Sequence, residues 1–253
     1  MIEVKNINKS FDGNLVLKDI SARFEDGKTN MIIGQSGSGK TVLLKCIIGL
    51  YRADSGRVEY DGRNLTQMRM SEVRNLRKEV GMLFQGSALF DSMTVLQNVL
   101  FPLEMFSEKT KKEQLERAKF CLNRVNMEDK SFSLMPSEIS GGMQKRVAIA
   151  RALVLQPKYL FCDEPNSGLD PKTSLVIDQL IHELTQEFDI TTIINSHDMN
   201  SVMEIGENII FINEGQKAWQ GTKEQIFHSQ NKELEDFVFA SELYKKVKAT
   251  NNQ

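Results

Sequence analysis

Apolar and polar residues alternate over the first two dozen positions of the chain. Ile2, Val4 and Ile7 are separated by charged or polar residues, and a second apolar series runs over residues 15–24. A period of two is typical of strands that bury only one face. Both stretches are therefore predicted to be strands of a half-buried antiparallel sheet, joined by a turn at residues 9–13.

Shorter apolar runs and longer helical patterns follow in alternation. Continuous apolar runs of this length are typical of buried strands, and apolar residues three or four apart are typical of helices that bury one face. Strands are predicted at residues 31–33, 57–60, 80–84, 159–162 and 190–194, helices at 109–125 and 171–188, and a closing hairpin at 209–219. This order of elements predicts an α/β fold.

The character of the chain changes at Gly86, after which long apolar stretches and one charged amphipathic stretch replace the short strands. We interpret residues 87–155 as a helical subdomain that is inserted into an α/β core formed by residues 1–86 and 156–221. Residues 222–253 form a C-terminal helical extension, which packs on its own domain or docks on a partner. Its helical spacing rests on Leu234, Phe237, Val238, Leu243, Tyr244 and Val247.

The most specific motif lies between the strand at 31–33 and an apolar helical run. It reads Gly34, Gln35, Ser36, Gly37, Ser38, Gly39, Lys40 and Thr41, which is the G-x-x-x-x-G-K-T pattern of a phosphate-binding loop. The glycines allow a tight turn that points backbone N–H groups at phosphates, and the helix N-terminus adds partial positive charge. Lys40 would bridge the β- and γ-phosphates, and the Thr41 hydroxyl would ligate Mg²⁺. The sequence therefore predicts a site for ATP and Mg²⁺.

A second motif places two acids at the end of the predicted strand 159–162. In parallel sheets, ligands bind at the carboxyl ends of the strands, so Asp163 and Glu164 suit a nucleotide site. Asp163 is predicted to hold Mg²⁺, directly or through water, and Glu164 to act as base toward the attacking water. Phe11, beside an Asp-Gly turn that precedes the phosphate loop, is either an adenine-stacking residue or a core edge residue.

A third motif, Ser140-Gly141-Gly142, stands before an Arg-rich helical run. Serine is a common N-cap, but two glycines weaken the first helical turn by roughly 1 kcal/mol each. We therefore expect bare backbone at this helix start to approach an anion.

Composition excludes several other classes of protein. A net charge of -2 and a pI near 6.0 give no nonspecific attraction to nucleic acid. Cys46, Cys121 and Cys162 are an odd number in apolar surroundings, as expected for buried free thiols in a reducing compartment. The N-terminal residues lack an apolar signal region, and no run of eighteen apolar residues occurs. We expect a chain that faces the cytosol and does not itself span a membrane.

Together these motifs resemble those of ATP-binding-cassette (ABC) ATPases, over about residues 1–225. The resemblance implies a P-loop NTPase fold with a RecA-like, mostly parallel sheet, an N-terminal antiparallel β subdomain and an inserted helical subdomain. It implies a head-to-tail homodimer that encloses two ATP molecules, each between one subunit's phosphate loop and the partner's Ser140-Gly141-Gly142. By the same resemblance Gln85 senses Mg²⁺ and the lytic water, His197 contacts the γ-phosphate, Asp170 communicates across the interface, and Phe11 stacks on adenine.

Two departures from the family pattern narrow the resemblance. The usual Leu-Ser-Gly-Gly-Gln is Ile-Ser-Gly-Gly-Met, ending at Met143, and Asn166 stands where Thr is usual. The Ser-Gly-Gly-Met form, with residues 81–95 and 98–103, is similar to the ATPase of Mla-type phospholipid transporters. That resemblance implies a peripheral subunit on the cytoplasmic face of the inner membrane, with a separate permease and with lipid-carrier and cytoplasmic adaptor subunits.

Residues 88–106 are too apolar for an exposed surface, yet they carry polar residues that exclude a membrane span. Leu96, Val99 and Leu100 are expected to be core. Residues 88–106 are also the expected contact with the permease, and Phe90, Met93, Phe101 and Met105 are expected to form a groove for a short helix of that subunit.

Other functions remain open on the sequence. A small-solute importer or exporter uses the same cassette, and so does a non-transport ATPase of iron–sulfur assembly. A chromosome-maintenance ATPase would need a long coiled coil between Gln85 and Ser140, but these residues are only 55 positions apart, without sustained heptads.

Overall fold

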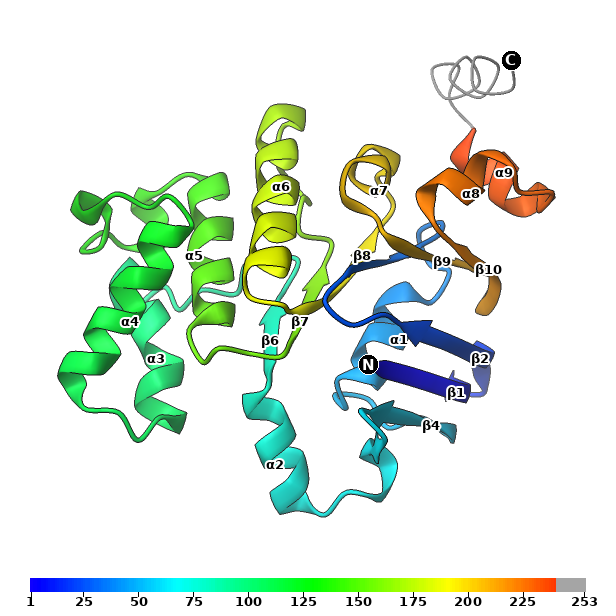
Figure 1. Cartoon of the computed structure of the whole chain (residues 1–253), viewed down its shortest axis with the longest axis horizontal. Helices are drawn as coiled ribbons and strands as arrows, with labels where there is room; N and C mark the ends of the chain where they lie inside the picture. The colour runs from blue at the N-terminus through cyan, green and yellow to red at the C-terminus, as the bar shows by residue number, and fades with distance from the viewer. Residues whose placement is uncertain (240–253) are drawn as a thin grey trace. The chain divides into compact units, whose positions relative to one another are not determined.

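The computed structural model describes residues 1–239 (Figure 1). The chain divides into two compact units. The first unit comprises residues 1–68 and the described residues from 193 onward, and the second unit comprises residues 69–192. The predicted helical positions Leu243, Tyr244 and Val247 lie outside the described residues.

An antiparallel sheet with strand order β2-β1-β4-β5 opens the first unit (Figure 1). β1 (Ile2–Phe11) pairs with β2 (Asn14–Phe24) and with β4 (Ser55–Tyr60), and β5 is the short strand Arg63–Asn64. The alternating apolar residues of β1 are buried, which confirms the predicted sheet. The predicted turn is shorter than expected, because Asp12 and Gly13 alone take it, with φ values of 48° and 82°.

Three further strands of the first unit support the phosphate loop. β3 (Thr29–Ile33) is buried at every residue and pairs in parallel with β9 (Asn208–Asn213). β10 (Gln216–Gly221) returns antiparallel to β9 and completes the predicted hairpin. α1 (Lys40–Ile47) begins directly after the phosphate loop, so the predicted order of strand, loop and helix is confirmed. β8 (Thr191–Ser196) begins in the second unit and ends in the first.

Three short helices complete the first unit: α7 (Met199–Ile205), α8 (Lys223–Phe227) and α9 (Lys232–Val238). Leu234 and Val238 are buried, and the Phe237 ring stacks on Phe211 of β9 with centroids 5.3 Å apart. The described part of the C-terminal extension therefore packs on its own unit.

The second unit contains β6 (Val80–Leu83), which pairs in parallel with β7 (Tyr159–Asp163). Its helices are α2 (Met70–Lys78), α3 (Val95–Phe106), α4 (Lys111–Arg124), α5 (Gly141–Leu153) and α6 (Pro171–Glu187). α3, α4 and α5, which lie within the predicted helical subdomain 87–155, pack against one another (green in Figure 1). Three short 3-10 turns lie at Leu65–Gln67 in the first unit and at Asp129–Ser131 and Pro136–Glu138 in the second.

Helix α3 buries fewer of its predicted core residues than expected. Val99 is fully buried, whereas Leu96 and Leu100 are half-buried. The fully buried positions of this helix include the polar Asn98 instead, so its inner face is not the purely apolar one that the sequence suggests.

Two helices were not predicted from the sequence. α2 buries only Leu76, so its sequence carries no apolar stripe that marks a helix. α7 has only seven residues, and so short an apolar pattern cannot be distinguished from that of a strand.

Candidate nucleotide site

The backbone of the phosphate loop depends on glycine at two positions. Gly34 has φ of 150°, and a Cβ there would lie 2.2 Å from the Ile212 carbonyl oxygen. Gly37 has φ of 81°, and no atom lies within 4 Å of the place that a Cβ would take, so its backbone faces open space. The loop is thus pinned against β9 at one end and open at its middle, as the approach of a ligand to backbone N–H groups requires.

Two polar side chains in this loop fit an anion. The Lys40 ammonium is buried and donates to the carbonyl oxygens of Gly34 at 2.8 Å and Gln35 at 3.0 Å. The Ser38 side chain is 7% exposed, and its hydroxyl has no hydrogen-bond partner among residues 1–239. The N-cap residue Gly39 offers no side-chain cap, and no acid stands in the first turn of α1. A buried cation, an unsatisfied hydroxyl and uncapped N–H groups together fit a polyphosphate.

The first unit also carries the two predicted residues Phe11 and His197. Phe11 ends β1 and is 38% exposed, and its ring meets that of Tyr51 edge-on with centroids 5.3 Å apart. The Lys9 ammonium lies 5.1 Å from the Phe11 centroid. Phe11 is therefore no buried core residue, which keeps adenine stacking open for it. His197 follows β8 and is exposed.

The second unit carries the predicted acids. Asp163 ends β7 and is buried, whereas the next residue, Glu164, is half-buried and has φ of 49°. A non-glycine residue in the left-handed region costs about 1–3 kcal/mol and persists only where its surroundings hold it. The Ser167 N–H donates to the Glu164 carbonyl oxygen at 3.1 Å, and the Asn166 amide donates to the buried Asp178 carboxylate at 2.8 Å. The turn that presents Glu164 is thus fixed from both sides.

Asn166, one of the two departures from the family pattern, has a structural role here. Its bond to Asp178 ties the turn after β7 to helix α6. A threonine at this position would have only a hydroxyl on a shorter side chain as donor. The sequence showed that Asn166 replaces the usual threonine, but not that Asn166 bonds to Asp178, twelve residues further along.

Gln85 follows β6 by two residues and is joined to the same turn. Its side-chain amide donates to the Ser167 hydroxyl at 3.2 Å, so the structure brings Gln85 beside the segment that holds Glu164. The buried Lys145 of α5 donates from its ammonium to the Gln85 carbonyl oxygen. Burial lowers the pKa of Lys145 below its usual value. Nothing in the sequence singled out this lysine.

The segment Ser140-Gly141-Gly142 has a structural role in addition to the predicted one. Ser140 caps its own helix, because its hydroxyl accepts from the Met143 N–H at 3.3 Å. A Cβ on Gly142 would lie 2.9 Å from Thr173 Cγ2, so a larger residue here would displace that side chain of α6. Ser140 is nevertheless exposed, and its bond is long, so its hydroxyl is accessible to a ligand.

Asp170, the remaining predicted residue, is the N-cap of α6. Its carboxylate accepts from the Thr173 N–H at 3.0 Å and from the Thr173 hydroxyl. These bonds lower the pKa of Asp170 below its usual range. Asp170 therefore has a structural role whatever its part in an interface.

Comparison with known proteins identifies the class. Residues 17–167 match the ABC transporter family, and the chain belongs to this family. It is 40% identical over 242 residues to the methionine import ATP-binding protein MetN of Clostridium acetobutylicum, covering 96% of this chain and 75% of that protein. It is 35% identical over 242 residues to the probable ribonucleotide transport ATP-binding protein mkl of Mycobacterium leprae, covering 94% and 68%.

The solved structures agree with the family. The dimeric structure of MJ0796, a bacterial ABC transporter cassette, has a TM-score of 0.80 and 32% identity, covering 88% of this chain and 98% of that one. MJ0796 has also been solved as a dimer in a post-hydrolysis state bound to ADP and Pi, with a TM-score of 0.79. The predicted P-loop NTPase fold is confirmed, and the chain is an ATPase of the ABC transporter family. Among residues 1–239, no helix has the length and apolar character needed to cross a membrane.

Proposed function

We propose that this chain is the ATP-hydrolysing subunit of an importer of small solutes, which acts through a separate membrane permease. The observation that carries the proposal is the phosphate loop of residues 34–41, with its buried lysine and its unsatisfied buried serine hydroxyl. The solute class is supported by MetN, which is named as a methionine importer and matches nearly the whole of this chain.

Phospholipid transport is a second candidate, and it is supported by particular residues. The Ser-Gly-Gly-Met signature and residues 81–95 and 98–103 resemble the ATPase of Mla-type transporters. MetN and mkl are named for methionine and ribonucleotide transport, and these names favour a small solute. A lipid substrate with lipid-carrier and adaptor subunits is therefore the alternative to be tested.

Residues of each unit have a proposed role in the binding and hydrolysis of ATP. Lys40 and the N–H groups of the phosphate loop bind and orient the phosphates of ATP. Glu164 accepts the proton of the attacking water, and the fixed turn after β7 holds its carboxylate in place for this role. Thr41, Gln85 and Asp163 would hold Mg²⁺, because hydroxyl, amide and carboxylate oxygens are its preferred ligands and the ion neutralises phosphate charge. His197 would contact the γ-phosphate.

A homodimer is part of the proposal. The structure of MJ0796 is dimeric, and in a head-to-tail pair the exposed Ser140 hydroxyl would reach the nucleotide of the partner subunit. Its bond to Met143 is long enough to be exchanged for a charge-assisted bond to phosphate, which is roughly twice as strong as a neutral one.

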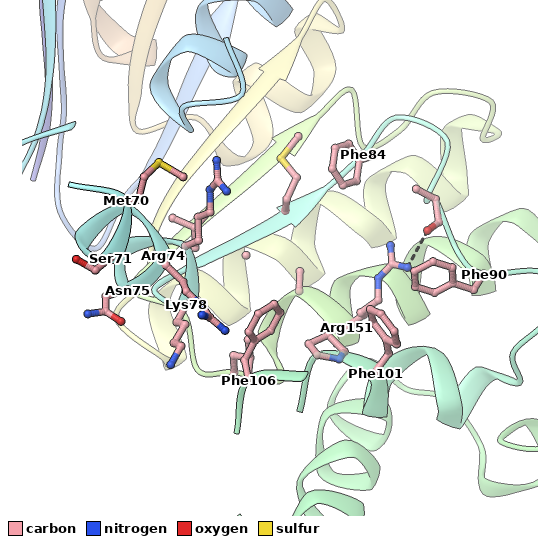
Figure 2. Close-up of a pocket in the computed structure, with 18 residues that line it drawn as sticks. Met70, Ser71, Arg74, Asn75, Lys78, Phe84, Phe90, Phe101, Phe106 and Arg151 are labelled. Carbon is pink, nitrogen blue, oxygen red and sulfur yellow. Dashed lines mark hydrogen bonds between the residues drawn. The ribbon is translucent and has the colours of Figure 1, made fainter. Parts of the chain in front are cut away.

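A groove of about 980 Å³ in the second unit is the proposed contact with the permease (Figure 2). Phe84, Phe90 and Phe106 line it and are exposed, together with Met70 at the start of α2. Of the groove residues predicted from the sequence, Phe90 and Phe101 line it, whereas Met93 and Met105 do not. Exposed aromatic side chains of this number call for a partner that covers them.

The positive charge of the groove indicates the kind of surface that the partner must carry. Arg74, Arg77 and Lys78 of α2 and Arg151 of α5 line the groove, and none of its 18 lining residues is an acid. The three α2 cations form no ion pair with a residue in the described part of the chain. The complementary partner is a short amphipathic helix of the permease with carboxylates beside its apolar face.

Two substitutions test the groove against a matched control. Phe106→Asp places a charge in the groove, and Phe120→Asp places one at a similarly exposed phenylalanine on α4 outside it. With both variants at normal thermal stability, Phe106→Asp should abolish co-purification of the permease and Phe120→Asp should not. Equal co-purification of the two variants would refute the groove as the docking site.

The transport function itself is tested on the assembled complex. The tagged chain is purified from native membranes in mild detergent, and the co-purifying proteins are identified. A multispan membrane protein is expected, and its absence would favour a non-transport ATPase of iron–sulfur assembly type. The reconstituted complex is then assayed for ATP-dependent uptake of methionine and other amino acids, and for movement of labelled phospholipid. Uptake of an amino acid supports the proposal, and lipid movement alone would establish the alternative.

A further inference from the structure

Two cations of helix α5, the buried Lys145 and the half-buried Arg151, contact the segment that follows β6. The Lys145 side chain is 4% exposed, and its ammonium donates to the Gln85 carbonyl oxygen. The Arg151 guanidinium donates to the carbonyl oxygens of Ser87 at 2.8 Å and Ala88 at 2.7 Å. Three of the four carbonyls between residues 85 and 88 are thus held by one helix. We call Lys145 and Arg151 the α5 clamp.

The segment held by the clamp has an unfavourable backbone conformation. Ser87 and Ala88 have φ values of 62° and 49°, in the left-handed region that is unfavourable for a residue with a side chain. Bonds from charged donors to carbonyl oxygens are stronger than neutral ones, and they compensate this cost. Without the clamp, the residues after Gln85 would relax toward commoner conformations.

The clamped segment has a contact at each end. At one end the Gln85 amide donates to Ser167 in the turn that holds Glu164. At the other, the Arg151 guanidinium lies 5.9 Å from the centroid of Phe90, a lining residue of the groove (Figure 2). A continuous series of contacts within the second unit therefore joins the groove to Gln85.

We infer that Lys145 and Arg151 are positioning residues for hydrolysis, which hold Gln85 at a fixed place relative to the helix that begins at Ser140. Their contacts are with the backbone around Gln85, and they act through it. The inference rests on the proposed function, because Gln85 matters to turnover only in an ATPase. A second part of the inference is that displacement of Phe90 in the groove changes the position of Gln85 through Arg151.

The alternative is that both cations only stabilise the fold. Arg117 of α4 provides the matched control, since its guanidinium donates to the carbonyl oxygens of Leu153 at 3.0 Å and Val154 at 3.1 Å, at the C-terminal end of α5. Removing Arg117 also takes a guanidinium from two backbone carbonyls, but leaves residues 85–88 untouched.

The test compares Lys145→Met and Arg151→Met with Arg117→Met in the full-length chain. Thermal stability, kcat, KM for ATP and backbone hydrogen exchange of a peptide covering residues 84–90 are measured for each. The clamp variants should lose about ten- to a hundredfold in kcat, the cost of misplacing a group by about 1 Å, with KM within about twofold. Exchange of the 84–90 peptide should rise in them, and Arg117→Met should change neither kcat nor this peptide.

Lys145→Gln is the rescue variant, because its amide retains an N–H donor, and it should recover part of the lost kcat. If Lys145→Met does not fold, Lys145→Gln replaces it as the test of the lysine. Normal kcat and unchanged exchange in the clamp variants, or equal losses in Arg117→Met, would overturn the inference. Hydrogen exchange measures the clamp without turnover, so it separates failure of the inference from failure of the proposed ATPase function.

Discussion

Removal of the Ser38 hydroxyl should raise the stability of the nucleotide-free protein and lower the stability of the ATP-bound protein. In the absence of nucleotide this group is buried without a partner among residues 1–239, and a buried unsatisfied hydroxyl costs about 1–3 kcal/mol. Ser38→Ala removes that group while leaving a side chain of nearly the same size. The free energy of unfolding of the nucleotide-free protein should therefore rise by about 1 kcal/mol or more.

Binding of ATP should change in the other direction. If the hydroxyl donates to a phosphate oxygen, its loss costs about 1.5–3 kcal/mol, the range for a hydrogen bond to a charged group. That cost corresponds to a Kd for ATP that is about ten- to a hundredfold weaker. Ser38→Ala should thus be the more stable protein without ATP, and the less stable one at an ATP concentration that saturates the wild type.

Urea unfolding with and without Mg-ATP measures both effects, and titration calorimetry gives the Kd. Ser36→Ala is the control, because Ser36 belongs to the same loop but is exposed. Its unfolding free energy should change by less than about 0.5 kcal/mol. Lower stability of nucleotide-free Ser38→Ala combined with an unchanged Kd would show that the hydroxyl is satisfied within the protein and does not face phosphate.

Two further predictions concern the dimer and the thiols. A mixed dimer is assembled from one Lys40→Ala subunit and one Ser140→Arg subunit. If Ser140 acts on the partner's nucleotide, both substitutions fall in one site, and the other site should retain ATP on equilibrium dialysis. Loss of ATP from both sites would refute the action of Ser140 in trans. Burial raises the pKa of Cys46 and Cys121 from 9.0 to about 11, so each thiol holds its proton more tightly when folded. Their contribution to stability is complete below pH 9 and is lost as the pH rises to 11, by about 1–3 kcal/mol per thiol. Urea unfolding across this range should show a smaller fall for the Cys46→Ala, Cys121→Ala double variant, and an equal fall would contradict the assignment.

The parts of the fold that the sequence predicts best are those with local causes. The order of strand, phosphate loop and helix at residues 29–47 follows from an apolar run, closely spaced glycines and a second apolar run. The pair Asp163-Glu164 was placed correctly at the end of a buried strand for the same reason.

The parts that the sequence does not predict depend on contacts between distant residues. The bonds from Lys145 to Gln85 and from Arg151 to Ser87 and Ala88 join residues about sixty positions apart, and a cation on an amphipathic helix is ordinarily exposed. α2 was missed because it buries a single side chain.

The groove was only partly predicted, for a related reason. Asn98 is fully buried, and its amide bonds to the backbone of Phe90 and Met93 fix the segment before α3. Those bonds set which side chains line the groove, and a polar residue in an apolar run carried no sign of them. Met93 and Met105 were chosen for their adaptability, and the groove is instead lined by Phe84 and Phe106.

Glu164→Gln decides whether this chain hydrolyses ATP with Glu164 as the base. ATP turnover of the purified assembly is measured beside the Kd for ATP, in the wild type and in Glu164→Gln. The variant should bind ATP with a Kd near that of the wild type and hydrolyse it about 10²–10⁴-fold more slowly, the loss typical of a missing general base. Near-normal hydrolysis by Glu164→Gln in the assembled complex would show that another group takes the proton of the attacking water.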